Sequence, residues 1–161
     1  FNNFQLGQWI FWFGFGSYMI LLPIVSYRVF WVKKIKEAVL PTITIFTAPA
    51  GLCLAGYMST FPEKSLLMIG WLMFLTLLMA TGVIIYLPKM ISDKFYPSFS
   101  AFTFPFVITA IGLKLSTKFL SKTLNSSILN YFSKGIELLS ICLVLFVLAK
   151  YFSYFQRVNY N

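Results

Sequence analysis

The sequence predicts an all-α integral membrane protein, and three observations support this fold class. Hydrophobic residues make up 59% of the 161-residue chain and charged residues only 11%, with a mean hydropathy of +0.81. A soluble domain has a far more polar composition. Apolar runs of membrane-spanning length recur five times, and two of them open with the same proline-containing motif.

A bilayer core about 30 Å thick requires roughly 20 predominantly apolar residues in one helix. The chain offers five such spans, which make up a single transmembrane region over residues 1–161. The spans cover about residues 8–32, 41–58, 65–87, 97–116 and 134–155.

The spans differ in their helix-breaking residues. The first contains Gly14, Gly16 and Pro23, whereas the third is rich in Leu and Met and the fifth is almost unbroken aliphatic sequence. Residues 117–133 are too polar to cross a membrane, so they predict an interfacial helix or a loop.

The second and fourth spans are copies of one unit. Pro41-Thr-Ile-Thr-Ile-Phe-Thr-Ala-Pro49 reappears as Pro97-Ser-Phe-Ser-Ala-Phe-Thr-Phe-Pro105, with both prolines and Phe-Thr at identical offsets. Such internal repeats determine architecture. The two copies differ at one informative position, where Ala48 in the first is replaced by Phe104 in the second.

A second proline inside each unit predicts a kink. Proline in a helix releases the carbonyl four residues earlier, here that of Ile45 or Ala101. The released group must find a partner on a neighbouring helix, a Thr side chain or water, and Thr47 and Thr103 are placed to help.

The kinked spans are therefore expected inside, and the smoother third and fifth spans outside against lipid. The predicted pore-lining or kink residues are Thr47, Ala48, Pro49, Gly51, Thr103 and Pro105. Two interpretations of Phe104 remain open at this point. The ring plugs a narrow channel, or it packs against the fifth span.

The distribution of cationic residues predicts how the chain is oriented in the membrane. The loops after the first and third spans and the C-terminus carry eight of the 13: Arg28, Lys33, Lys34, Lys36, Lys89, Lys94, Lys150 and Arg157. The opposite side carries five: Lys64, Lys114, Lys118, Lys122 and Lys134. By the positive-inside rule, those two loops and the C-terminus are cytoplasmic.

The net charge of +9 favours anions as the transported solute. Lys114, Lys118 and Lys122 recur every four residues, so a helix would align them as an electropositive vestibule. The alternative is that these lysines reach the lipid headgroups. Glu137 is expected to form a surface pair with Lys134.

Other classes of function have little support. Cys53 and Cys142 lie in apolar runs without metal-ligand spacing, there is no histidine, and only four residues are acidic. We therefore expect no metal, no cofactor, no catalytic site and no enzyme activity. No soluble basic module exists that could bind nucleic acid.

Three stretches carry a resemblance to the tellurite-resistance/dicarboxylate transporter family, which includes bacterial TehA-type proteins and plant guard-cell slow anion channels. They are Trp12-Phe-Gly-Phe-Gly-Ser-Tyr-Met-Ile-Leu-Leu-Pro23, residues 41–51 with Thr-Ala-Pro-Ala-Gly, and Phe95-Tyr-Pro-Ser-Phe-Ser-Ala-Phe-Thr-Phe-Pro105. The fifth span matches only in hydrophobicity.

The resemblance implies ten helices in five hairpins, with kinked inner helices around a pore and three protomers that each have their own pore. It implies that this chain is the C-terminal half of a larger protein, with the N-terminal helices missing. It also implies that Phe104 occludes the pore beside the kink at Pro105. Two and a half hairpins cannot enclose such a pore, so we expect this chain alone not to conduct.

The leading hypothesis is therefore a multi-pass protein of the cell membrane, plasma or inner, that passes small anions through a pore gated by Phe104. One alternative is a proton-coupled C4-dicarboxylate or tellurite-exporting carrier. Another, of a different class, is a non-transporting membrane scaffold or an incomplete fragment.

Overall fold

The computed structural model describes residues 4–31, 37–92, 95–124 and 128–159, all in helices or in short connections between them. The α-helices are α1 (Phe4–Trp31), α2 (Thr47–Thr60), α3 (Leu66–Met90), α4 (Thr103–Leu124) and α5 (Ile128–Asn159). Two 3₁₀-helices, η1 (Glu37–Phe46) and η2 (Pro97–Phe102), lead directly into α2 and α4.

Five helical segments are long and apolar enough to cross a membrane, as the sequence predicts. They are Phe4–Val29, Glu37–Thr60, Leu66–Met90, Pro97–Lys122 and Asn130–Arg157. The second and fourth each combine a 3₁₀-helix with an α-helix.

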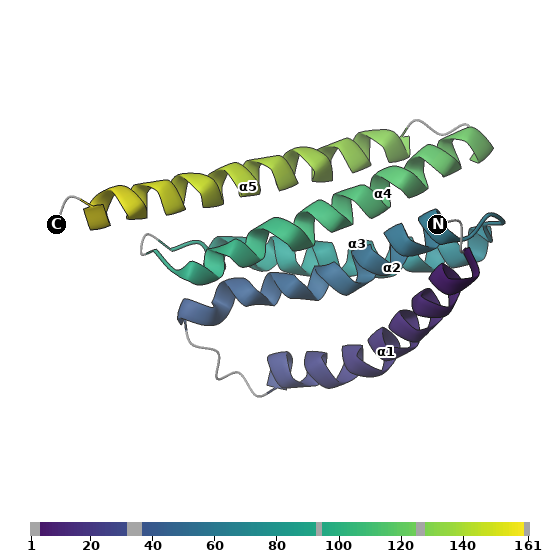
Figure 1. The fold of residues 1–161 in the computed structure, drawn as a ribbon, viewed down its shortest axis with the longest axis horizontal. Helices are drawn as coiled ribbons and strands as arrows, with labels where there is room; N and C mark the ends of the chain where they lie inside the picture. Colours follow the sequence, from purple (N-terminus) through teal and green to yellow (C-terminus); the bar gives the residue numbers. More distant parts are fainter. Residues whose placement is uncertain (1–3, 32–36, 93–94, 125–127, 160–161) are drawn as a thin grey trace.

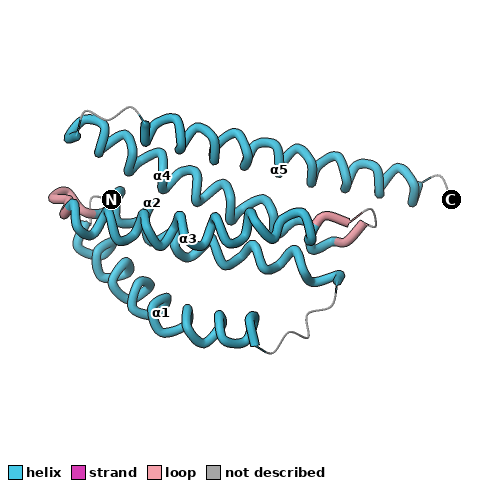
Figure 2. The backbone as a smooth tube through the Cα atoms, turned by 180° about the vertical axis from the view of Figure 1, so that it is seen from behind, coloured by secondary structure: helices cyan, strands magenta, loops and turns pink. Residues whose placement is uncertain are grey.

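Helices α2 and α4 lie side by side in the centre, and η1 and η2 contact each other at their common starting end. Helix α3 lies behind this pair in Figure 1 and in front of it in Figure 2. Helix α5 packs against α4, whereas α1 packs against α2 alone among the described elements. The two repeats are therefore inner and parallel, as predicted.

Two apolar clusters hold these helices together. The first joins all five α-helices, with Phe11, Leu54, Leu72, Leu113 and Ile136 among its buried members. The second surrounds the fully buried rings of Phe99, Phe102 and Phe106, which pack near residues of α3 and α5.

The described parts of residues 117–133 belong to the two neighbouring helices and form no separate element. Helix α4 continues to Leu124, and α5 begins at Ile128. The extension of α4 is amphipathic, because Ser116, Thr117 and Leu120 are buried while Lys118 and Lys122 are exposed. The Ser116 hydroxyl donates to the Gly112 carbonyl at 2.8 Å, so its burial leaves no unpaired polar group.

Part of the predicted topology lies outside the described residues. The ranges 32–36 and 93–94 contain four of the cations that predict the orientation, Lys33, Lys34, Lys36 and Lys94.

The two cysteines are free, with Cys53 buried and Cys142 exposed.

Candidate pore-lining site

The two inner helices share one kind of break. In each, a 3₁₀-helix becomes an α-helix at the Thr of the repeat, Thr47 or Thr103, and Pro49 or Pro105 is the third residue of that α-helix. The first N–H groups of an α-helix have no partner within the helix, so proline costs little there. The break is thus a change of helix type, and not a kink within a continuous α-helix.

Hydroxyl side chains stabilise both 3₁₀-helices in the same way. Thr44 donates to the Pro41 carbonyl at 2.7 Å, and Ser100, its repeat equivalent, donates to the Pro97 carbonyl at 3.0 Å. Three residues later, Thr47 donates to the Thr44 carbonyl and Thr103 to the Ser100 carbonyl, at 3.0 and 2.8 Å. The two copies of the repeat therefore form the same side-chain hydrogen bonds at equivalent positions.

The Thr44 hydroxyl also joins the two repeats. It lies 2.6 Å from the carbonyl of Ala101, the group that Pro105 releases. A hydroxyl carries one proton, so Thr44 shares it between Ala101 and Pro41. The sequence leaves a neighbouring helix, a Thr side chain and water open as partners of this carbonyl.

The same contact corrects one detail of the sequence interpretation. Thr47 and Thr103 bond the carbonyls three residues before them, so they do not satisfy the carbonyls of Ile45 and Ala101. Thr44 was overlooked because its target is 57 positions away in the chain. The hydroxyl at the equivalent position, Ser100, was the available signal.

Helices α2 and α4 approach each other closely through small residues. A Cβ atom on Gly51 would lie 2.9 Å from the Thr109 backbone, and one on Gly112 would lie 2.9 Å from the Gly51 carbonyl. The Thr109 hydroxyl at this contact is buried without a hydrogen-bond partner among the described residues. Gly51 thus lies in the α2–α4 contact.

The structure separates the predicted site residues by burial. Thr47 and Ala48 are buried, as is Pro105, while Pro49 and Thr103 are half-buried. The Phe104 ring is 54% exposed, whereas Ala48 at the same repeat position is 5% exposed. The two positions therefore differ in exposure as well as in size.

Phe104 begins an exposed stripe along α4. At 3.6 residues per turn, Ile111, Leu115, Lys118 and Lys122 all fall within about 40° of Phe104 around the helix axis. All five side chains are exposed. The stripe is apolar over its first half and cationic at its end, and we call it the Phe104 stripe.

Lys114 lies about 80° away from that stripe, on the side of α5. Its Nζ is 2.7 Å from Oε1 of Glu137, whereas the sequence suggests Lys134 as the partner of Glu137. That prediction is wrong, because the packing of α4 against α5 brings Lys114 to the carboxylate. Lys134 instead lies 6.0 Å from the centre of the Tyr131 ring.

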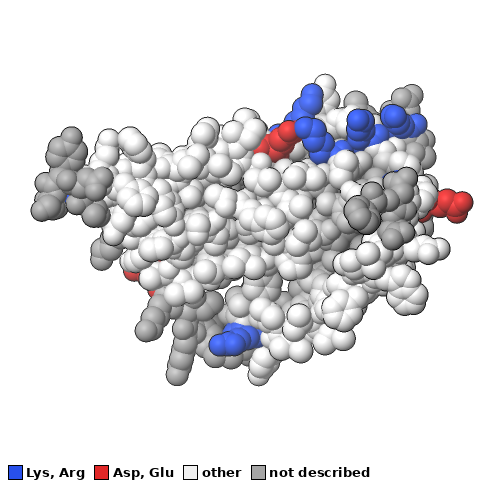
Figure 3. Space-filling view, in the orientation of Figure 1, with Lys and Arg blue, Asp and Glu red and all other residues white. Residues whose placement is uncertain are grey.

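The predicted lysine vestibule is therefore only partly a group of free charges. Figure 3 shows basic side chains gathered over the end of α4 and the start of α5, beside an acidic one. Lys118 and Lys122 are exposed on this surface, while Lys114 is neutralised by its partner.

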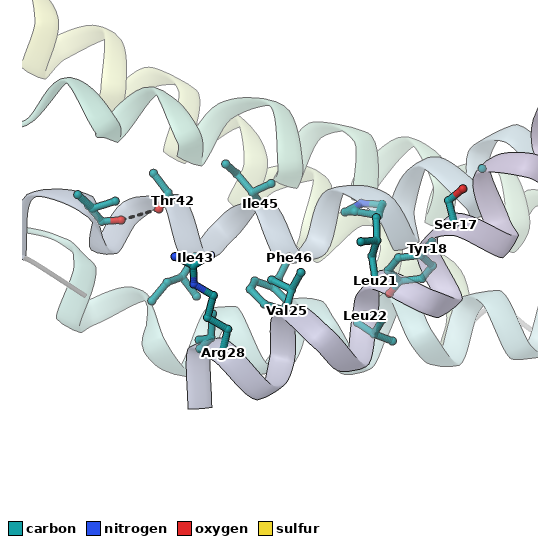
Figure 4. Close-up of a pocket in the computed structure, with 14 residues that line it drawn as sticks. Ser17, Tyr18, Leu21, Leu22, Val25, Arg28, Thr42, Ile43, Ile45 and Phe46 are labelled. Carbon is teal, nitrogen blue, oxygen red and sulfur yellow. Dashed lines mark hydrogen bonds between the residues drawn. The ribbon is translucent and has the colours of Figure 1, made fainter. Parts of the chain in front are cut away.

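A groove of about 770 Å³ separates α1 from η1. On the α1 wall, Val25 and Arg28 lie opposite Ile43 and Phe46 of η1, as Figure 4 shows. Ser17 and Tyr18 of α1 and Thr42 and Ile45 of η1 also line the groove. Most of the lining is apolar, with Arg28 at one end.

The described residues contain no cluster of His, Cys, Asp or Glu side chains that could bind a metal ion. No curated protein and no solved structure matches the chain.

The family model that matches describes SLAC1, the voltage-dependent anion channel, and it matches residues 3–152. The match covers nearly all of the chain, including both proline repeats and the Phe104 stripe. The chain is therefore a multi-pass membrane protein that belongs to the SLAC1 family of voltage-dependent anion channels.

Proposed function

We propose that the Phe104 stripe lines the anion pathway and that the Phe104 ring obstructs it. The observation that carries this proposal is a large aromatic side chain, 54% exposed, on an inner helix where the ring two residues later, Phe106, is fully buried. The neighbouring Phe102 and Phe106 fill the core, so the exposure of Phe104 does not arise from loose packing.

The order of side chains along the stripe suits an anion. Lys118 and Lys122 raise the concentration of anions at one end, and an apolar stretch follows that contains no carboxylate. A pathway of this kind binds anions weakly, so it favours a channel over a tightly binding carrier. Small inorganic anions are its expected substrates.

In this proposal the 161-residue chain contributes two inner helices to a larger ring, and further inner helices complete the pore. The C-terminus and the starting ends of η1 and η2 face the cytoplasm. Three such pores form a trimer in the assembled protein. The charge distribution supports the orientation, and the family resemblance supports the ring of inner helices and the trimer.

The test is the anion conductance of the completed channel with Phe104→Ala. Removal of the ring is expected to raise the conductance several-fold, and Phe104→Leu is expected to give an intermediate value. Phe74→Ala is the matched control, because Phe74 is 55% exposed and lies on a different helix, α3, outside the Phe104 stripe.

Equal conductance of Phe104→Ala and the unmodified channel would refute the obstruction. An equal rise in Phe74→Ala would show a general loosening of the helices. Neither exposed ring supports the core, so both variants are expected to fold.

A further inference from the structure

A pocket of about 330 Å³ lies at the C-terminal end of α5, beside Phe95, which precedes η2. Two of its lining residues are cations, Lys150 and Arg157, and their spacing of seven residues places both on one face of the helix. Ser153, between them in the chain, also lines the pocket. No Asp or Glu among the described residues does so. The pocket, which we call the α5 pocket, therefore suits an anion.

Contacts between aromatic rings fix the wall of the α5 pocket. The Phe95 ring stacks on Tyr154, with ring centres 4.4 Å apart, and meets Tyr151 edge to face at 4.9 Å. The Tyr151 hydroxyl in turn donates to the Pro97 carbonyl at 2.8 Å. These contacts form without a ligand, so binding requires little further ordering of the wall.

Both cations have donors that a phosphate group can use. The Lys150 Nζ donates to the Ser92 carbonyl at 3.3 Å and lies 5.7 Å from the centre of the Phe146 ring. An ammonium group has three N–H donors, so Lys150 can bind an anion while it keeps this bond. Arg157 is exposed at the pocket, and a guanidinium group pairs with two oxygens of one phosphate.

The position of the α5 pocket along the span matches the lipid headgroups. The span Asn130–Arg157 has 28 residues, which is about 42 Å of helix. A bilayer core is about 30 Å thick, and about 40–45 Å with its headgroup regions. Arg157, the last residue of the span, therefore lies at the level of the headgroups, and the long side chain of Lys150 reaches towards them.

An exposed apolar strip of α5 ends at the same pocket. Leu138, Cys142, Leu145 and Ala149 fall within about 60° of one another around the helix axis, and all four are exposed. Ala149 also lines the α5 pocket. The strip extends from the pocket into the membrane over about 16 Å, so an acyl chain can lie along it.

We propose that the α5 pocket binds the phosphate group of an anionic phospholipid. Lys150 and Arg157 contact the phosphate oxygens, and one acyl chain lies along the strip from Ala149 to Leu138. The strip and the headgroup depth favour a lipid over free phosphate. The α5 pocket and the Phe104 stripe lie on different helices, so lipid binding does not depend on the proposed anion pathway.

The test is native mass spectrometry of the 161-residue chain in neutral detergent micelles, titrated with dioleoylphosphatidylglycerol. About 100 mM ammonium acetate screens charges more than about 10 Å apart. Lys150→Gln with Arg157→Gln is expected to weaken lipid binding about tenfold, because charge-assisted hydrogen bonds are lost. Arg28→Gln with Lys89→Gln is the matched control and is expected to keep the affinity. It removes one Arg and one Lys from the last turns of α1 and α3, outside the pocket.

Ser153→Trp fills the α5 pocket and leaves its charges in place, so this variant is also expected to lose affinity. Phe152→Trp is its control, because Phe152 is the adjacent residue, is 65% exposed and does not line the pocket. Both positions are exposed, so both variants are expected to fold.

Two further ligands separate the possible sources of the phosphate. Dioleoylphosphatidylcholine, with the same acyl chains and no net charge, is expected to bind more weakly than dioleoylphosphatidylglycerol. Inorganic phosphate at the same concentration as the lipid is expected not to displace it.

Equal lipid affinity of the pocket variants and their controls would overturn the proposal, as would equal binding of the two lipids. Displacement by inorganic phosphate would show a site for a free anion, and would overturn the lipid as occupant.

Discussion

Thr44 is the side chain through which one repeat stabilises the other. It is fully buried between η1 and η2, and its hydroxyl lies within 2.7 Å of two carbonyls, those of Pro41 and Ala101. An unpaired carbonyl in this apolar surrounding would cost free energy. The Thr44 hydroxyl therefore lowers the free-energy cost of the helix interruption at Pro105 in a membrane.

Replacing Thr44 by Val keeps the shape and removes the hydroxyl. We expect this change to lower the free energy of unfolding by about 1 kcal/mol, the net contribution of one buried hydrogen bond. Thr44→Ser, which retains the donor, is expected to lose less. Unfolding titrations with sodium dodecyl sulfate in mixed micelles measure both variants, and a Val variant as stable as the Ser variant would contradict the role of the hydroxyl.

For single residues, the sequence predicts which polar groups need a hydrogen-bond or charge partner, but it does not identify that partner. The proline offsets correctly indicate that the Ala101 carbonyl is released. They cannot reveal that Thr44 reaches it, because that contact depends on how η1 lies against η2. The pairing of Lys114 with Glu137 was missed for the same reason, since α4 and α5 had to be placed first.

Helix α4 shows how the 3.6-residue period of a helix places buried and exposed residues on separate faces. Helix α4 buries Leu113 and Leu120 and exposes Lys118 and Lys122 on another face. Average hydropathy combines these faces, so the polar end of α4 resembled an interfacial segment. The spacing of its apolar positions, at three, four and seven residues, was the better signal.

The cationic end of α4 gives a prediction about ionic strength. Lys118→Gln with Lys122→Gln is expected to lower anion conductance several-fold at about 10 mM salt, where charges act over about 30 Å. Glu137→Gln is expected to raise it, because Lys114 then regains an unpaired charge. Current measurements at about 1 M salt are expected to show little difference among these variants.

Lys89→Gln provides the control, since Lys89 lies in the last turn of α3 at the opposite end of the bundle. An equal loss of conductance in this variant would indicate a general effect of net charge. A loss that persists unchanged at high salt would contradict an electrostatic origin.

At the scale of the whole molecule, α1 packs against fewer elements than any other described helix does. It contacts α2 alone among the described elements, whereas α2 also contacts α3, α4 and η1. Local opening follows such differences in contact. We therefore expect amide hydrogen exchange in detergent micelles to be faster in α1 than in α2.

Peptide-level mass spectrometry can resolve the two helices, and α3 serves as an internal reference for an outer helix with more neighbours. Equal exchange in α1 and α3 would contradict this order of stability.

The architecture was the most predictable level. Five spans, two parallel inner helices and smoother outer helices follow from hydropathy and from the repeat, and the structure has this arrangement. The change from 3₁₀-helix to α-helix did not follow, because proline spacing indicates where a helix is interrupted and says nothing of the helix type on either side.

The bond from Thr44 to Ala101 has a direction, with a donor on one unit and an acceptor on the next. In this pair, the first repeat unit supplies the donor and the second supplies the acceptor. This bond requires both units to enter the membrane from the same side, because inversion of one unit would move its donor or acceptor to the opposite end of the other. Insertion of both units with the same topology is thus a requirement for the contact between them.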